Sequence, residues 1–182
     1  MFWGGRDPVD NYHAVVSDQR FATDLVIERG GSSHSGSGIR NEEYYCFGAD
    51  ILAPAEGLVA ATANTVADQR PGDMNPEQPL GNHVIIDHGN GEFSFLAHLQ
   101  RGSVTVQPGS RVEAGQTIGR CGNSGNSSEP HLHYHLQNSV TFGVGEGLPA
   151  QFIDFEADGA PVPRGELQRG QKVARHSATP LR

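Results

Sequence analysis

Three histidines stand at alternate positions in the stretch SSEPHLHYHLQ, namely His131, His133 and His135. Alternate side chains of a β-strand point to the same face, so a strand here would carry three imidazoles on one face and apolar or aromatic side chains on the other. Imidazole nitrogens bind zinc and exchange protons near neutral pH. This stretch is therefore a candidate for metal binding, for acid–base catalysis, or for both.

A catalytic zinc ion typically takes three nitrogen or oxygen ligands from the protein and leaves a fourth position for water. The alternating histidines could supply only part of such a set, so another histidine and a carboxylate must come from elsewhere. The stretch NYHAVVSDQRFATDLV offers both, in His13 and Asp24. A further histidine, His98, lies in FLAHL, where strand alternation predicts that it shares a face with Ser94 and Leu96. Each residue alone would be unremarkable, but together they predict a functional site.

Short strands are the elements that must position these residues. The 182-residue chain contains 24 glycines and 11 prolines, which favours turns over long helices. Strand-like runs separated by turn signals recur at 48–66, 82–99, 104–122 and 130–137, and the second predicts a hairpin that turns at His88–Gly91. Because no helical period exceeds two turns, we predict an all-β, mainly antiparallel fold.

Composition limits the partners and the location of the protein. A formal net charge of -8 argues against broad binding to nucleic acid, and no apolar run is long enough for a membrane span. The start, MFWGGRDPVDNYH, lacks the features of a secretion signal, so we expect either a cytoplasmic protein or removal of an export signal. Cys46 and Cys121 lack metal-site spacing, and we expect two buried thiols, with one bridge as the alternative in an exported protein.

Two long loops and a polar tail lie outside the predicted strands. Residues 29–43 are rich in glycine and serine, and residues 67–81 contain three prolines. Such loops on a β scaffold either line a binding site or form plain mobile insertions. We expect a folded domain over 1–156 and a polar, basic tail over 157–182 that is extended or partly ordered.

The order of several motifs is similar to that of a known family. The stretches DQRFATDL, DILAPAEGLVAA, GNHVIIDHGNGEFSFLAHL and VQPGSRVEAGQTIGRCGNSGNSSEPHLHYHL, in this order, resemble the M23 peptidases, the lysostaphin-like zinc endopeptidases. The resemblance covers roughly residues 11–137. It implies a lysostaphin-like β-sheet core with a substrate groove flanked by long loops and one Zn²⁺ ion. It also implies hydrolysis of peptide bonds in peptidoglycan cross-links or Gly-rich peptides, and hence an extracytoplasmic location, periplasmic or secreted.

The resemblance also implies roles for individual residues. Asp24 falls where the family has its zinc-binding aspartate, and His133 falls on the second histidine of the His-x-His motif, a zinc ligand. His131 and His98 correspond to the two catalytic histidines that do not bind the metal. One of them would act as general base, and the other would stabilise the oxyanion or protonate the leaving amine.

The first zinc ligand departs from the family pattern. The family usually has a histidine four residues before the aspartate, and Arg20 occupies that position here. We therefore expect His13, eleven residues before Asp24, to be the ligand, because a loop of that length closes at little cost. His34, or a site without metal, remains the alternative.

Two other histidines are expected to have lesser roles. The family commonly has an acidic residue at the position of His135, so we expect this side chain to lie beside the ligands or in the groove wall. His88, in the predicted hairpin turn, is expected to be structural.

Three classes of function remain open. The first is a zinc endopeptidase, and the second is a catalytically inactive M23-like regulatory or binding module. The third is a lipoyl- or biotinyl-like carrier, suggested by VQPGSRVEAGQTIG, but the attachment lysine is missing because the single lysine, Lys172, lies in the tail. A cupin would need a glutamate where Gln137 stands.

Overall fold

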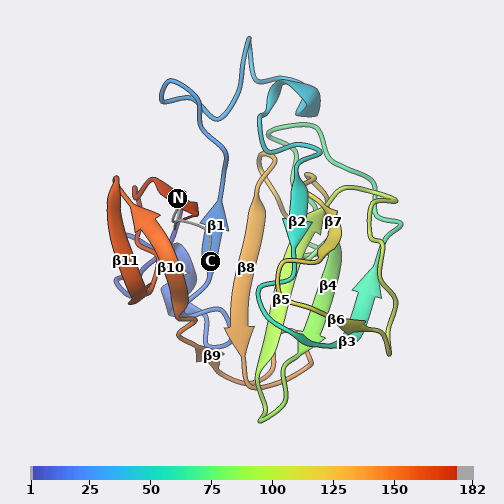
Figure 1. Cartoon of the computed structure of the whole chain (residues 1–182). Coiled ribbons are helices and arrows are strands. Elements are labelled where there is room, and N and C mark those ends of the chain that lie inside the picture. The colour runs from blue at the N-terminus through green and yellow to red at the C-terminus, as the bar shows by residue number, and fades with distance from the viewer. Residues whose placement is uncertain (1, 176–182) are drawn as a thin grey trace, which may run out of the picture.

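Short antiparallel strands form most of the regular structure (Figure 1). The computed structural model describes residues 2–175. Its main sheet is seven-stranded, with the order β1-β8-β5-β4-β3-β6, and β9 pairs with β8. The bounds of these strands are Thr23–Leu25 for β1, Leu132–Gln137 for β8, Phe93–Leu99 for β5, Asn82–Asp87 for β4, Gly57–Ala63 for β3, Arg111–Val112 for β6 and Gly147–Leu148 for β9.

The prediction of an all-β, mainly antiparallel fold is confirmed. Within residues 2–175, the helices are two short 3-10 segments, η1 (Tyr12–Val15) and η2 (Asn41–Glu43). In the same residues, no helix is long and apolar enough to cross a membrane. The hairpin predicted at 82–99 is formed by β4 and β5, whose turn contains a non-glycine residue, Asn90, at φ 55°. Asparagine tolerates this left-handed conformation better than most residues, which suits it to the turn.

The two faces of the main sheet bury different amounts of apolar surface. Val84 and Leu96 belong to a large cluster on one face, whereas Ile85, Phe95 and Ala97 form a smaller cluster on the other. Full burial of each large apolar side chain contributes roughly 1.5–3 kcal/mol, so the larger cluster supplies most of the stability. The second face has fewer apolar side chains and carries buried histidines instead.

A second strand pairing and a disulfide join two segments that are far apart in the sequence. Strands β2 (Asp50–Leu52) and β7 (Thr117–Arg120) form a two-stranded sheet, and a disulfide links Cys46 to Cys121 just outside it. The expectation of two buried thiols was therefore wrong. The pairing of β2 with β7 brings together two residues that are 75 positions apart in sequence, which no spacing rule predicts.

The C-terminal part of the described chain forms a three-stranded sheet beside β1 (Figure 1). Its strands are β10 (Phe152–Ala157), β11 (Ala160–Gly165) and β12 (Val173–Arg175). Phe155 and Leu167 form a small apolar cluster that also contacts Leu25 of β1. The domain boundary at residue 156 stays a prediction, although that residue lies inside β10. Residues 176–182 of the expected tail lie outside the described part.

Candidate metal centre

Strand pairing places two of the expected ligands directly opposite each other. Asp24 on β1 pairs with His133 on β8, although the two residues are 109 positions apart in sequence. Both side chains are buried, with exposed fractions of 2% and 3%. The Nδ1 atom of His133 lies 2.9 Å from Oδ1 of Asp24. Directly opposite residues of paired strands point to the same face of a sheet, so both side chains lie on the face with the smaller apolar cluster, beside Ala97.

The third expected ligand, His13, comes from the 3-10 helix η1 near the start of the chain. Asn11 caps this helix, because its side-chain oxygen accepts a hydrogen bond from the backbone N–H of His13. The amide nitrogen of Asn11 donates to the carbonyl oxygens of Gly5 and Ala22, both at 2.9 Å. Asn11 is fully buried and therefore holds the turn against the chain that leads into β1. The Nε2 atom of His13 reaches Oδ2 of Asp24 at 3.1 Å.

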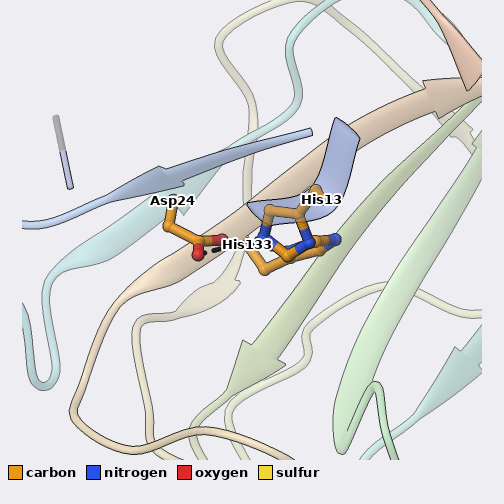
Figure 2. A group of neighbouring side chains, drawn as sticks. All are labelled: His13, Asp24 and His133. Atoms are coloured by element: carbon orange, nitrogen blue, oxygen red, sulfur yellow. Dashed lines mark hydrogen bonds and ion pairs between the residues drawn. The ribbon is translucent and has the colours of Figure 1, made fainter. Parts of the chain in front are cut away.

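The geometry of this group fits a zinc ion. One donor atom from each of His13, Asp24 and His133 lies within 4.8 Å of the other two (Figure 2). Zinc bonds of about 2.0–2.1 Å in a tetrahedral arrangement place donor atoms roughly 3.3 Å apart. Nδ1 of His133 lies 2.9 Å from one carboxylate oxygen of Asp24, and Nε2 of His13 lies 3.1 Å from the other, so both imidazoles are close enough to share an ion with this carboxylate. A two-nitrogen, one-oxygen set is also chemically suited to zinc. The structure thus brings together the three residues predicted as ligands.

The electrostatic environment favours the protonation states that bind metal. Burial by itself would raise the pKa of Asp24, but His131 and the close contacts with the imidazoles of His13 and His133 lower it well below its usual value. Burial lowers the pKa of His133 and outweighs the opposite effect of Asp24. Metal ions bind carboxylate and neutral imidazole, so both shifts prepare the site. Burial, together with His133, also lowers the pKa of His135 well below its usual value, so this ring is neutral.

His98 does not lie on the face that strand alternation predicts. Alternation would group it with Ser94 and Leu96, but its ring centroid lies 4.7 Å from that of His131 and 5.7 Å from that of His133. Its backbone has φ 62°, a left-handed conformation that is uncommon for residues other than glycine, and the pairing of β4 with β5 shifts register nearby. This irregularity redirects the side chain, and strained backbone of this kind is frequent at functional sites.

His98 and His131 present the same ring atom to the site. Nδ1 of His98 lies 2.9 Å from the carbonyl oxygen of Ser124, and Nδ1 of His131 lies 2.7 Å from that of Glu129. A carbonyl oxygen only accepts, so each Nδ1 carries a hydrogen. In the neutral rings, Nε2 therefore has a free lone pair. Nε2 of His131 lies 3.6 Å from Oδ1 of Asp24, which places this atom beside the candidate metal position.

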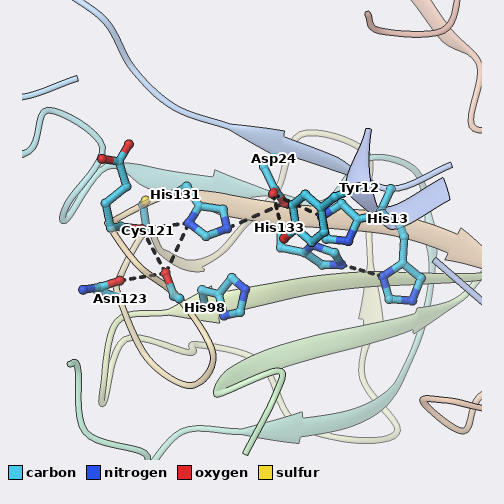
Figure 3. A network of polar contacts seen from close by, with 12 residues as sticks. Tyr12, His13, Asp24, His98, Cys121, Asn123, His131 and His133 are labelled. Atoms are coloured by element: carbon cyan, nitrogen blue, oxygen red, sulfur yellow. Dashed lines mark hydrogen bonds and ion pairs between the residues drawn. The ribbon is translucent and has the colours of Figure 1, made fainter. Parts of the chain in front are cut away.

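A chain of amide and hydroxyl groups connects His131 to both long loops. Figure 3 shows the part of this chain between His131 and Asn123. The hydroxyl of Ser127 lies 3.2 Å from Nδ1 of His131 and donates to Oδ1 of Asn123 at 2.7 Å. The amide nitrogen of Asn123 donates in turn to Oδ1 of Asn41 and to the carbonyl oxygen of Gln69, both at 3.1 Å. Asn41 and Gln69 belong to the loops 29–43 and 67–81. Sequence reasoning did not find this network, since its members are joined only by the folded chain.

Tyr12 was also missed, although it directly precedes His13. Its ring packs on that of His13 with 3.9 Å between centroids, and its hydroxyl donates to Oδ2 of Asp24 at 3.4 Å. Burial, followed by the charge of Asp24, raises the pKa of Tyr12, so the hydroxyl keeps its proton. Tyr12 is nevertheless 52% exposed, and it forms a partly open wall of the site.

His34 and His88 lie outside the donor group. The ring of His34, the alternative first ligand, packs against Tyr44, with 5.1 Å between ring centroids. His88 lines a cavity of about 560 Å³ that also contacts Ser94 and Tyr134, whose side chains lie on the opposite face of the main sheet from the ligands. Its Nδ1 donates to the carbonyl oxygen of Glu56 and its Nε2 lies 2.8 Å from Oγ of Ser94, contacts that suit a structural role.

The fold and the site define a β-sheet protein with a candidate His–Asp–His metal centre, and comparison with known proteins identifies its family. The profile of Peptidase family M23 matches residues 32–143, more than half of the chain, so the protein belongs to this family. The matched segment contains His98, His131 and His133, whereas His13 and Asp24 precede it.

Named relatives match about half of the chain. Peptidoglycan DD-endopeptidase ShyA of Vibrio cholerae is 45% identical over 89 residues, which are 49% of this chain and 17% of ShyA. Murein hydrolase activator EnvC of Escherichia coli is 37% identical over 87 residues, or 48% of this chain and 20% of EnvC. The catalytic domain of the M23 protein EnpA of Enterococcus faecalis has a similar structure, with a TM-score of 0.46 and 23% identity over 70% of this chain and 85% of that one.

Proposed function

We propose that this protein is a zinc-dependent endopeptidase that hydrolyses peptide bonds in peptidoglycan cross-links or in Gly-rich peptides. The observation that carries the proposal is the convergence of His13, Asp24 and His133 within 4.8 Å, beside two imidazoles with free Nε2 atoms. The relatives named as peptidoglycan-acting proteins and the membership in a peptidase family support the substrate class.

In this proposal, His13 Nε2, one oxygen of Asp24 and His133 Nδ1 hold one Zn²⁺ ion. The ion would supply Lewis acidity to a peptide carbonyl and promote ionisation of water. His98 and His131 form the proton-transfer pair. One accepts a proton from the attacking water at Nε2, and the other, once protonated there, stabilises the oxyanion or protonates the leaving amine.

The backbone carbonyls of Ser124 and Glu129 assist this pair. Each accepts a hydrogen bond from one Nδ1 atom and thereby keeps the corresponding Nε2 directed at the site. Leu80, whose carbonyl oxygen accepts the hydrogen bond of the His98 backbone N–H, lines a mainly apolar pocket of about 310 Å³. We propose that a peptide substrate runs past this pocket, between the two long loops.

We propose an extracytoplasmic location, because peptidoglycan lies outside the cytoplasm. The Cys46–Cys121 disulfide supports it, since such bonds persist mainly in oxidising compartments.

The test combines metal content with activity on purified cross-linked peptidoglycan and on a pentaglycine peptide. We expect about one equivalent of zinc after reconstitution, and hydrolysis of at least one substrate. His13→Ala should lose zinc, whereas His131→Ala should keep zinc and lose turnover. His88→Ala is the matched control, because it removes an imidazole from the opposite face of the sheet and should change neither property.

Two outcomes would overturn the proposal. Less than about half an equivalent of zinc in the wild type would refute a metal centre. Full zinc content without hydrolysis of either substrate would favour the alternative of a catalytically inactive M23-like regulatory or binding module; among the relatives, EnvC is named as a murein hydrolase activator.

A further inference from the structure

Three polar side chains follow one another along one face of β8, and all three are buried. His133, His135 and Gln137 have exposed fractions of 3%, 1% and 0%. His133 belongs to the candidate metal centre, whereas the proposed mechanism uses neither of the other two. Buried polar groups without hydrogen-bond partners cost free energy, so the direction of each hydrogen bond in this row is constrained.

The orientation of the Gln137 amide is fixed by the loop that follows β8. Its nitrogen lies 2.6 Å from the carbonyl oxygen of Ser139, 2.9 Å from that of Thr141 and 3.3 Å from that of Val144. These oxygens only accept hydrogen bonds, so the NH₂ group must face them. Oε1 of Gln137 therefore points the other way, where it lies 3.1 Å from Nε2 of His135.

The tautomer of His135 follows from this amide. Because Oε1 of Gln137 only accepts, Nε2 of His135 carries the hydrogen, and the neutral ring then has a free lone pair on Nδ1. Phe95 stacks on the ring, with 4.5 Å between centroids and 14° between planes, and holds its orientation. His135 Nδ1 is thus a fixed hydrogen-bond acceptor behind the metal centre.

The tautomer of His133 follows in turn. Its Nε2 lies 2.9 Å from Nδ1 of His135, so this nitrogen carries the hydrogen. The remaining nitrogen, Nδ1, then presents a lone pair to Oδ1 of Asp24 at 2.9 Å. Two acceptors face each other at this position, and a cation between them satisfies both. The row of hydrogen bonds therefore prepares Nδ1 of His133 as a metal ligand.

We propose that His135 and Gln137 are positioning residues that hold His133 in the Nε2–H tautomer and so direct its Nδ1 at the metal. This inference rests on the proposed zinc centre. An acidic residue, which the M23 resemblance leads one to expect at position 135, would accept the same hydrogen while adding a negative charge behind the ligand. In this chain a neutral imidazole and a neutral amide perform that task.

The experiment compares zinc affinity, by competition with a chelator, in the wild type and four variants. His135→Phe keeps a flat ring against Phe95 but removes the acceptor, and Gln137→Met removes the group that orients His135. Both should weaken zinc binding by about 10–100-fold, the usual effect of losing a partner behind a ligand. His135→Glu restores an acceptor and should recover most of the affinity. Tyr134→Phe, a buried change on the opposite face of β8, is the matched control and should bind zinc normally.

The outcomes separate this inference from the proposed function. Absence of zinc from the wild type would refute the metal centre itself. If the wild type binds zinc and the folded His135→Phe and Gln137→Met variants bind it equally well, only the positioning role of His135 and Gln137 is refuted. An equal loss of zinc affinity in Tyr134→Phe would also refute that role. Nitrogen NMR of the wild type provides a check that needs no variant: His135 should be protonated at Nε2, and protonation at Nδ1 would overturn the inference.

Discussion

Removal of the Cys46–Cys121 disulfide should destabilise the fold by several kcal/mol. The bridge spans 75 positions of sequence, and the chain-entropy relation for a loop of this length gives about 4.5 kcal/mol at 25 °C. Cys46→Ala/Cys121→Ala is the preferred variant, because both residues are buried and serine would add two hydroxyl groups to an apolar core.

Urea unfolding followed by circular dichroism measures the effect. With a slope of about 2 kcal/mol per molar urea, the loss corresponds to a fall of about 2 M in the unfolding midpoint. The wild type in reductant should match the double variant, and reductant should have no further effect on the variant itself.

The result that would refute the reasoning is a double variant within about 1 kcal/mol of the oxidised wild type. Two reactive thiols in the denatured, unreduced wild type would refute it more directly, because the bridge would then not exist.

Three further predictions concern the site and its surroundings. Gly81→Ala should cost roughly 1–3 kcal/mol in thermal or urea unfolding, because Gly81 has φ 56° and a Cβ there would lie 2.4 Å from opposing backbone atoms. Gly72→Ala, also at positive φ but with open space around it, should cost less. Ser127→Ala should lower kcat by about tenfold without changing zinc content, because it frees His131 from one of its two partners; an unchanged kcat would contradict this. Burial lowers the pKa of His98 well below 6.5 in the folded state, so in chelator-treated protein the unfolded chain binds more protons below that pH. The free energy of unfolding should therefore fall as pH drops below about 6.5, by up to about 1.4 kcal/mol per pH unit for this group, and a flat profile in urea titrations would contradict it.

The sequence predicted those features that depend on local pattern. Alternation in residues 132–137 identified β8 and the face that carries His133, and the hairpin at 82–99 followed from its turn residues. The stretch NYHAVVSDQRFATDLV supplied His13 and Asp24 as candidates, and the family resemblance assigned Asp24 a ligand's position; the structure places both residues beside His133. Their roles as ligands stay a proposal.

Features that depend on long-range pairing or on local irregularity escaped the sequence. The disulfide requires β2 to meet β7, and the face of His98 is set by a left-handed backbone rather than by alternation. Strands β11 and β12 lie within residues 157–182, which were expected as a tail, since their polar and proline-containing sequence shows little strand period. Gln137 was considered only as a missing glutamate, because its role depends on carbonyl groups of a loop whose conformation no pattern reveals.

The short strand β1 links metal release from the candidate centre to local opening of the chain, which the stability of the apolar core does not determine. Thr23–Leu25 lies at the edge of the main sheet and carries Asp24, and η1 with His13 is attached just before it. Edge segments open locally at much lower free energy than the core, and such opening here would remove two of the three donors while β8 stays in place. Metal release and local opening of residues 11–25 would therefore be one linked equilibrium. Amide hydrogen exchange in β1 would slow as the metal concentration rises, while exchange in β4 and β5 would stay unchanged.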